Sequence, residues 1–146
     1  MKAIIEIPAG TRNKYEKSPD GLGFILDRVV AEPYPYSYGY ILGTLAEDLD
    51  SADVFVLTKD PIYPGIAVDL EVLGMIKMLD NGVEDHKILA IPKGSEPPND
   101  FIFARMYSKI MSFLATYKDG VFLGGFRDKQ TALDYIQKCV VAKENE

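Results

Sequence analysis

Apolar and polar residues alternate along much of the first two-thirds of the chain, a pattern that predicts a β-rich protein. In the clearest case, Val68, Leu70 and Val72 alternate with Asp69 and Glu71, as expected of a strand with one buried face. Short β-branched or aromatic runs recur between Gly, Pro and Asp turn signals. The pattern predicts strands near residues 3–7, 14–17, 24–30, 53–57, 67–78 and 87–91.

The last third of the chain changes to a helical period. Apolar residues recur at steps of three and four over 102–117, after Asn99 and Asp100, either of which can act as the N-cap. A second helix is predicted over 129–142, with Asp128 as its cap. Its core-facing residues are expected to be Ala132, Ile136, Cys139 and Val140. We therefore expect a mainly β (α+β) fold, a mostly antiparallel barrel that carries two helices.

Length and charge narrow the class of protein. The 146 residues suit one domain over 1–146, and the net charge of −6 counts against general nucleic-acid binding, because phosphate backbones are repelled. No run approaches the roughly 20 apolar residues of a membrane-spanning helix, and the N-terminus does not resemble a signal peptide. The single cysteine, Cys139, fits a reducing compartment. These features predict a cytoplasmic protein with neither nucleic-acid nor membrane partners.

Carboxylates concentrate in two segments, 48–53 and 80–85, each next to a predicted strand. A calcium EF-hand loop is excluded, because its Gly and Glu positions are occupied by Asp53 and Lys59. A solvated acidic loop explains the first segment alone equally well. If strand connections bring the two segments together, their oxygen ligands favour Mg²⁺ or Mn²⁺ over zinc.

The sequence also suggests the surroundings of two isolated titratable residues, His86 and Glu6. His86 lies between Asp85 and Lys87, and we interpret it as a surface residue on the opposite face from its neighbours. Glu6 interrupts the apolar run 4–7, where a carboxylate is costly unless a cation pairs with it. We therefore expect Glu6 to lie beside a basic side chain.

Cations and hydroxyls that suit phosphate oxygens lie on other strand-like segments. Lys14 and Glu16 share one strand face, for which a surface ion pair is the ordinary explanation. Arg28 could bind a phosphate group with a bidentate fork. Tyrosines occupy every second position of the segment 34–40, either as a packed aromatic ladder or as hydroxyl donors to a polar site. Pro35 argues against a regular central strand there.

Taken together, these segments resemble the soluble family I inorganic pyrophosphatases, specifically a compact and somewhat divergent prokaryotic type. The matching pieces follow the family's order over roughly residues 4–120: Ile5-Glu6-Ile7-Pro8, Lys14-Tyr15-Glu16, Asp27-Arg28, Tyr34-Pro35 to Tyr40, Asp48 to Asp53, Asp80 to Lys87, and Tyr117-Lys118-Asp119. The resemblance implies an OB-like five-stranded barrel with flanking helices. It also implies hydrolysis of pyrophosphate to two orthophosphates with Mg²⁺, for which Mn²⁺ could substitute, in a homo-oligomer, commonly a hexamer.

The resemblance also implies residue roles. Asp50 would be the general base, and Asp53 would bridge two metal ions. The metal ligands and their outer shell would be Asp48, Asp53, Asp80, Asp85, Glu6 and Glu16. The substrate phosphates would be bound by Lys14, Arg28, Tyr38, Tyr117 and Lys118, with Tyr34 and Lys87 beside them.

The chain departs from the family pattern at several places. Ser51 stands where the family has Pro within the DxDPxD string, and Ser37 stands where it has Asn within YPxNYGY. The segment 93–100 is short, and 120–126 lacks the family's Lys-Gly-Lys-Trp stretch.

Two further functions fit the same residues. One is a non-catalytic OB-like module that binds metals or polyanions, and the other is a metal-dependent hydrolase of organic phosphates. Only the tyrosines offer an evident surface for a base or a sugar, which makes the organic substrate the weaker alternative.

Overall fold

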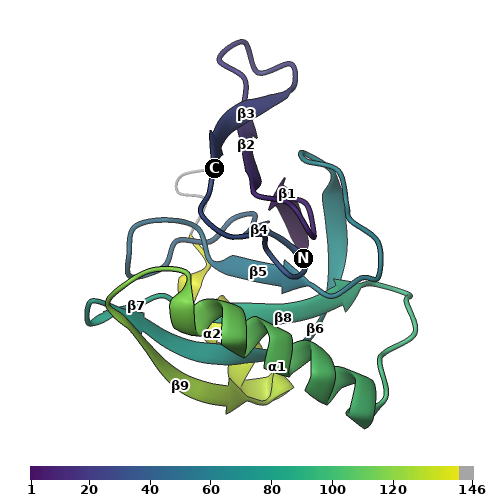
Figure 1. Cartoon of the computed structure of the whole chain (residues 1–146), viewed down its shortest axis with the longest axis vertical. Helices are drawn as coiled ribbons and strands as arrows, with labels where there is room; N and C mark the ends of the chain where they lie inside the picture. Colours follow the sequence, from purple (N-terminus) through teal and green to yellow (C-terminus); the bar gives the residue numbers. More distant parts are fainter. Residues whose placement is uncertain (142–146) are drawn as a thin grey trace.

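The centre of the molecule is a closed ring of five strands, seen in a computed structural model that describes residues 1–141 (Figure 1). Around the ring the strands are β1 (Lys2–Ile7), β4 (Ser37–Ile41), β5 (Asp53–Val56), β8 (Lys87–Pro92) and β6 (Ala67–Asp80). Pairing of β1 with β6 closes the ring, and all pairs are antiparallel except β5 with β8. The mainly β, five-stranded barrel expected from the sequence is therefore confirmed.

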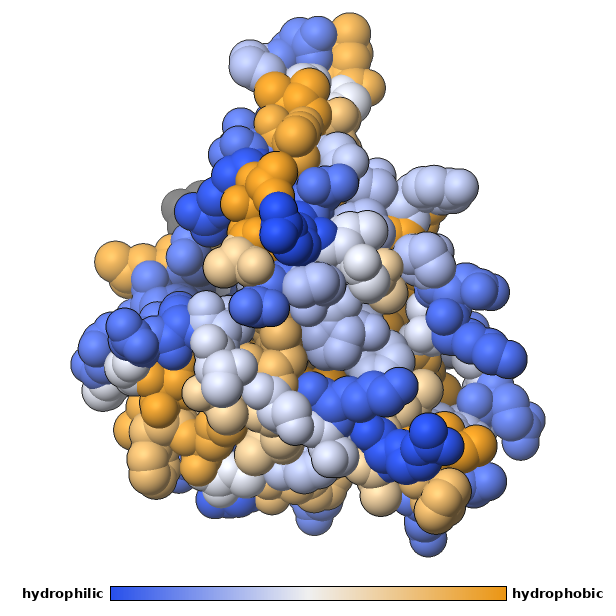
Figure 2. Space-filling view, viewed as in Figure 1, coloured by the Kyte–Doolittle hydropathy of each residue, from blue (hydrophilic) through white to orange (hydrophobic). Residues whose placement is uncertain are grey.

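Four further strands lie outside this barrel. β7 (Val83–Glu84) and β9 (Val121–Arg127) pair with the far end of β6. β2 (Asn13–Lys17) and β3 (Phe24–Val29) form a separate hairpin that projects from the barrel at the top of Figure 1. Figure 2 shows apolar side chains along this projection, where Leu22, Leu26 and Val29 are more than half exposed.

The position of β4 corrects one expectation. Pro35 argues against a central strand, yet β4 begins only two residues later, at Ser37, and pairs on both sides, with β1 and with β5. Gly39 is required in this strand, because a Cβ there would lie 1.8 Å from the carbonyl oxygen of Ile4 on β1.

The two helices begin where the sequence predicts. The Asn99 side chain accepts a hydrogen bond from the backbone N–H of Ile102 at 2.9 Å and caps α1 (Asp100–Thr116). Asp128 caps α2 (Lys129–Cys139) in the same way. No described helix has the length and apolarity to cross a lipid bilayer.

The end of α2 differs from the expected one. The helix stops at Cys139, and Val140 is 50% exposed rather than core-facing, because extended backbone at Val140 pairs with Thr44. Ala142, the expected last residue, lies outside the described residues. Tertiary pairing therefore ends the helix before its sequence pattern does.

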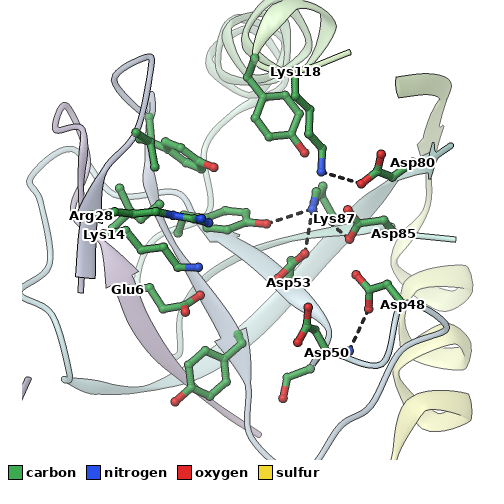
Figure 3. Close-up of a pocket in the computed structure, with 17 residues that line it drawn as sticks. Glu6, Lys14, Arg28, Asp48, Asp50, Asp53, Asp80, Asp85, Lys87 and Lys118 are labelled. Carbon is green, nitrogen blue, oxygen red and sulfur yellow. Dashed lines mark hydrogen bonds and ion pairs between the residues drawn. The ribbon is translucent and has the colours of Figure 1, made fainter. Parts of the chain in front are cut away.

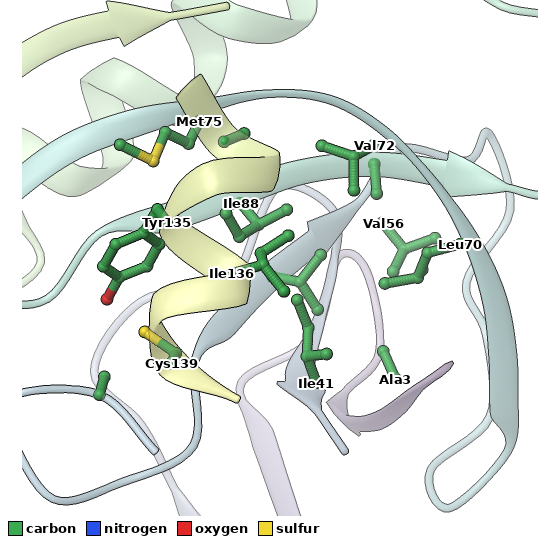
Figure 4. Close-up of a cluster of buried hydrophobic side chains, with 14 of the residues drawn as sticks. Ala3, Ile41, Val56, Leu70, Val72, Met75, Ile88, Tyr135, Ile136 and Cys139 are labelled. Atoms are coloured by element: carbon green, nitrogen blue, oxygen red, sulfur yellow. The ribbon is translucent and has the colours of Figure 1, made fainter. Parts of the chain in front are cut away.

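Both faces of β5 and β8 are buried, which fixes how the barrel is covered. Val54, Val56 and Ile88 belong to the cluster that packs against Ile136 and other α2 residues (Figure 4). The alternate residues of the same strands, such as Phe55, belong to a second cluster with α1. The starts of β5 and β8 are thus held firmly between two cores.

Candidate active site

A pocket of about 570 Å³ opens where β5 and β8 begin. It is strongly polar and lies between the barrel, the β2–β3 hairpin and the segment after α1 (Figure 3). Its lining consists of Glu6, Ile7, Lys14, Arg28, Val30, Tyr34, Tyr38, Tyr40, Asp48, Asp50, Ser51, Asp53, Asp80, Asp85, Lys87, Tyr117 and Lys118.

Three carboxylates from separate segments converge in this pocket. Asp48, Asp53 and Asp85 each offer one oxygen atom, and these atoms lie within 4.8 Å of one another. Asp53 begins β5, whereas Asp48 lies in the β4–β5 loop and Asp85 precedes β8. A donor set made only of carboxylate oxygens suits a hard divalent cation such as Mg²⁺ or Mn²⁺. The residues present therefore fit a divalent metal.

Lys87 lies at the centre of the acidic cluster. Its Nζ donates hydrogen bonds to Asp53 Oδ2 at 2.7 Å, to Asp85 Oδ1 at 3.0 Å and to the Tyr38 hydroxyl at 2.9 Å. Asp53 and Lys87 face each other in the register of the parallel β5–β8 pair. The side chain of Lys87 is only 2% exposed, so its ammonium is a buried positive charge that balances two carboxylates.

Burial and this ammonium set the protonation of the cluster. Burial raises the pKa of Asp53 to about 6 against the opposing pull of Lys87. Burial also disfavours the charged form of Asp85, but Lys87, the neighbouring Asp53 and Lys118 together outweigh that effect and lower the pKa of this carboxyl. Burial disfavours the charge on Lys87 as well, yet the two carboxylates raise its pKa above its ordinary value. The buried lysine is therefore firmly protonated.

The loop that carries Asp48 and Asp50 is closed at its base by a buried hydroxyl. Thr44 donates to the Ile41 carbonyl at 2.6 Å and accepts from the Ala52 N–H at 2.9 Å. The backbone N–H of Asp50 donates to Asp48 Oδ1 at 3.1 Å. These bonds hold both ends of the loop next to β4 and β5.

The opposite wall carries two basic side chains from the hairpin. Lys14 on β2 and Arg28 on β3 are cross-strand neighbours, so both extend from the same face of the hairpin toward the pocket (Figure 3). Within residues 1–141, neither forms an ion pair or a side-chain hydrogen bond. Both cations are available to an anion in the pocket.

Phenols and a fourth cation complete the upper wall. Burial raises the pKa of Tyr34 and Tyr38, which keeps their hydroxyls neutral and able to donate. Lys118, just after α1, forms an ion pair with Asp80 at 2.6 Å that reaches across the pocket mouth. The pocket thus combines a carboxylate wall with cationic and phenolic donors to an anion.

Comparison with known proteins identifies the fold and the family. The family model described as inorganic pyrophosphatase matches residues 3–144. The chain belongs to the inorganic pyrophosphatase family.

Individual members of the family match this chain over nearly the whole length of both proteins. The chain is 39% identical to the inorganic pyrophosphatase of Halalkalibacterium halodurans, covering 95% of this chain and 92% of that protein. An inorganic pyrophosphatase structure from Coxiella burnetii superimposes with a TM-score of 0.83 at 32% identity, covering 96% of this chain and 92% of that one. The structure from Thermus thermophilus also gives 0.83, at 33% identity, over 96% and 88% of the two chains.

All the site residues expected from the sequence line this pocket, with one exception. Glu16 is exposed and lies outside it. Glu16 shares a strand face with Lys14 but stands two residues, roughly 7 Å, farther along a hairpin that leads away from the barrel. The structure therefore gives Glu16 no contact with the carboxylate cluster.

Tyr40 and Ser51 also line the pocket, although the resemblance implies no role for either. The spacing of two between Tyr38 and Tyr40 was the available signal, because it places both on one face of β4. Ser37, the departure from the family's Asn, is fully buried and accepts hydrogen bonds from the N–H groups of Ala9 and Ile62 at 3.1 and 3.0 Å. Its hydroxyl joins two loops behind the site.

His86 corrects another expectation, because it is buried and only 4% exposed. It does point away from Asp85 and Lys87, but α2 covers that face, and its ring packs edge-on against Tyr135 at 4.8 Å. Its Nδ1 accepts the Met78 N–H at 2.9 Å. The alternation is thus as expected, and the assumed solvent exposure is wrong.

Glu6 lies near the basic side chain of Lys14, as expected, but among the described residues it forms no direct ion pair. Burial raises its pKa to about 7, and the negative charges of Asp53 and Asp50 add to that effect. Lys14 acts in the opposite direction without a direct contact. In the metal-free pocket Glu6 therefore keeps its proton to a higher pH than a solvent-exposed glutamate does.

The raised pKa of Glu6 predicts a pH-dependent stability of the metal-free protein. The group binds its proton more tightly when folded, so its contribution is complete below its ordinary pKa of 4.5 and is lost as pH rises toward 7. We expect the free energy of unfolding to fall over this range by on the order of 2 kcal/mol because of Glu6. Glu6→Gln should remove this part of the slope.

Urea denaturation at several pH values between 4.5 and 8, after dialysis to remove metals, measures the effect. The raised pKa of Asp53 acts in the same direction, so the variant should retain a smaller slope. An identical slope in the wild type and in Glu6→Gln would contradict the assignment.

Proposed function

We propose that this pocket hydrolyses inorganic pyrophosphate to two orthophosphates with the help of Mg²⁺, or Mn²⁺ in its place. One observation carries the proposal: three convergent carboxylates face Lys14 and Arg28, two cations that no residue of 1–141 pairs with, across a single pocket. A substrate with phosphoryl groups at both ends matches a site with cation binding on one wall and fixed positive charges on the other. The family of the chain supports the same substrate.

In this proposal Asp48, Asp53 and Asp85 hold the divalent cations. A bound divalent cation lowers the pKa of a water molecule toward neutrality and neutralises phosphoryl oxygens. The fit rests on the oxygen-only donors, since neither Cys139 nor His86, the single cysteine and the single histidine of the sequence, lines the pocket. Asp80 extends the acidic wall at the pocket mouth.

Asp50 is the proposed general base. Its carboxylate lines the pocket beside Asp48 and Asp53, and within residues 1–141 it forms no ion pair or hydrogen bond of its own. It is free to take a proton from the attacking water. The water oxygen forms a bond to one phosphorus, and the bond between that phosphorus and the bridging oxygen breaks.

Positive charge and hydroxyl donors then stabilise the departing phosphate. Lys14 and Arg28 bind phosphoryl oxygens from the hairpin wall, whereas Tyr38, Tyr117 and Lys118 approach from the barrel and α1 side. Donors placed where negative charge develops lower the barrier, because they need no reorganisation during the reaction. Tyr34 and Lys87 support this wall, since Lys87 donates to the Tyr38 hydroxyl.

Phosphate release from pyrophosphate tests the proposal directly. We expect activity with Mg²⁺, lower or altered activity with Mn²⁺, and loss of at least about 99% of turnover when EDTA removes the metal, because metal ions are required for both charge neutralisation and water activation. Excess Mg²⁺ added after EDTA should restore it. Turnover that persists unchanged in EDTA would refute the metal-dependent mechanism.

The same assay separates the alternatives. A non-catalytic module would bind Mg²⁺ and pyrophosphate without releasing phosphate. A hydrolase of organic phosphates would turn over a phosphate monoester faster than pyrophosphate. We expect neither result, since the pocket offers charged and phenolic groups to both ends of a small anion.

We also propose that the chain forms one domain that works in the cytoplasm as a homo-oligomer, with a hexamer implied by its resemblance to prokaryotic members. Exposed large apolar side chains support self-association: Phe101 at the start of α1 is 71% exposed, and Phe122 on β9 is 63% exposed. Sedimentation velocity measures the mass of the particle.

A further inference from the structure

The acidic cluster brings together two loops that no strand pairing joins directly: the β4–β5 loop, which carries Asp48, and the short connection from β7 to β8, which carries Asp85. The backbone N–H of Asp85 donates to the Met78 carbonyl on β6, so the barrel holds this residue in place. Asp48 lies in the middle of its loop, and within residues 1–141 its side chain accepts a hydrogen bond only from the N–H of Asp50. Leu49, between Asp48 and Asp50, adopts a left-handed φ of 72°, a conformation unusual for a branched side chain.

A single side-chain hydrogen bond joins the two loops in the described part of the chain. Glu47 Oε1 accepts the backbone N–H of Glu84 at 2.7 Å. Glu47 is the residue before Asp48, and Glu84 is the residue before Asp85. The bond therefore connects the residues next to two carboxylates that lie 37 positions apart in the sequence.

We propose that Glu47 is a positioning residue of the metal site, an inference that rests on the proposed function. Glu47 does not line the pocket, so it acts through Asp48 and Asp85 rather than on the substrate. Its carboxylate holds the two loops at the separation at which their oxygens can share a cation. Without this bond, the binding of a cation must first bring the loops together, and the affinity for the cation falls.

A matched pair of variants separates this role from simple charge. Glu47→Ala removes the hydrogen-bond acceptor and the negative charge, whereas Glu47→Gln removes the charge but keeps a carbonyl oxygen that can accept the Glu84 N–H. Glu96→Ala removes an exposed carboxylate from a distant loop and controls for net charge. The difference between the Ala and Gln variants therefore measures the hydrogen bond itself.

Isothermal titration calorimetry with Mg²⁺ alone, on metal-free full-length protein, measures the affinity without any turnover. We expect Glu47→Ala to weaken binding by about 10-fold or more, as is usual when a group that orients metal ligands is removed. Glu47→Gln should remain within about 3-fold of the wild type, and Glu96→Ala should bind as the wild type does. Equal affinities of the Ala and Gln variants would overturn the inference.

Amide hydrogen exchange at Glu84 gives a second measurement that does not depend on calorimetry. The Glu84 N–H should exchange faster in Glu47→Ala than in Glu47→Gln, and equal rates would also overturn the proposal.

The proposed metal site and the proposed role of Glu47 fail in distinguishable ways. A wild type that binds no Mg²⁺ refutes the metal site itself, whereas a wild type that binds Mg²⁺ with equal affinities in both variants refutes only the role of Glu47.

Discussion

Asp50→Asn is expected to lower kcat for phosphate release from pyrophosphate by about 100- to 10,000-fold, the range associated with loss of a general base. Asn has nearly the size of Asp but cannot take the proton of the attacking water. Asp53 and Asp85 are unsuited to replace it, because both carboxylates are engaged by Lys87. A steady-state phosphate-release assay at saturating Mg²⁺ and pyrophosphate measures the loss.

Asp50→Asn should lower kcat without changing the fold. Its affinity for Mg²⁺ should change far less than its kcat. Asp60→Asn, which alters an exposed carboxylate outside the pocket, is the matched control and should retain wild-type activity. A kcat for Asp50→Asn within a few-fold of the wild-type value would remove Asp50 as the base.

The second large effect concerns stability. Lys87→Met should destabilise the metal-free protein by about 3–5 kcal/mol near neutral pH, the cost typical of breaking a buried ion pair by removing one partner. The ammonium of Lys87 balances the charges of Asp53 and Asp85, and the Lys87 side chain is almost entirely shielded from solvent. Removing it leaves two carboxylates close together without a counter-charge.

Mg²⁺ should restore much of this loss, because a cation held by the same carboxylates replaces the missing charge. The loss should also shrink toward pH 5, where the raised pKa of Asp53 allows that carboxyl to be protonated. Urea denaturation with and without Mg²⁺ measures both effects.

Lys118→Met provides the matched control for Lys87→Met. Lys118 pairs with Asp80, but its side chain is 40% exposed, so its removal should cost less than about 1 kcal/mol. Equal stability of Lys87→Met and the wild type without metal would contradict the account of the buried ammonium.

The sequence predicts the local elements well wherever periodicity and caps coincide. The alternation from Val68 to Val72 lies within β6, and Asn99 and Asp128 cap the two helices. These features depend on neighbours in the chain, which the sequence displays directly. The same patterns predicted a mostly antiparallel barrel with two helices, and the family resemblance added that the barrel is OB-like and has five strands.

What the sequence missed depends on contacts between distant segments. His86 is buried because α2 covers its strand face, and α2 ends early because Val140 pairs with Thr44. The direction of the β2–β3 hairpin leaves Glu16 outside the pocket although Lys14 lines it. None of these contacts can be recognised from the periodicity of apolar and polar residues along the chain.

The contacts that Lys87 makes within the acidic cluster also could not be predicted from the sequence. Lys87 is near the acidic segment in the chain, and the resemblance placed it beside the substrate. Its contacts with Asp53 and Asp85 depend on the parallel register of β5 and β8, which no short-range pattern encodes. The hydrogen bond between Glu47 and Glu84 has the same origin.

A crystal of the protein soaked in Mn²⁺ and measured near the manganese absorption edge tests the central claim most directly. The account predicts an anomalous peak bounded by the carboxylate oxygens of Asp48, Asp53 and Asp85. A strong peak elsewhere, with no peak among these three carboxylates, would contradict it.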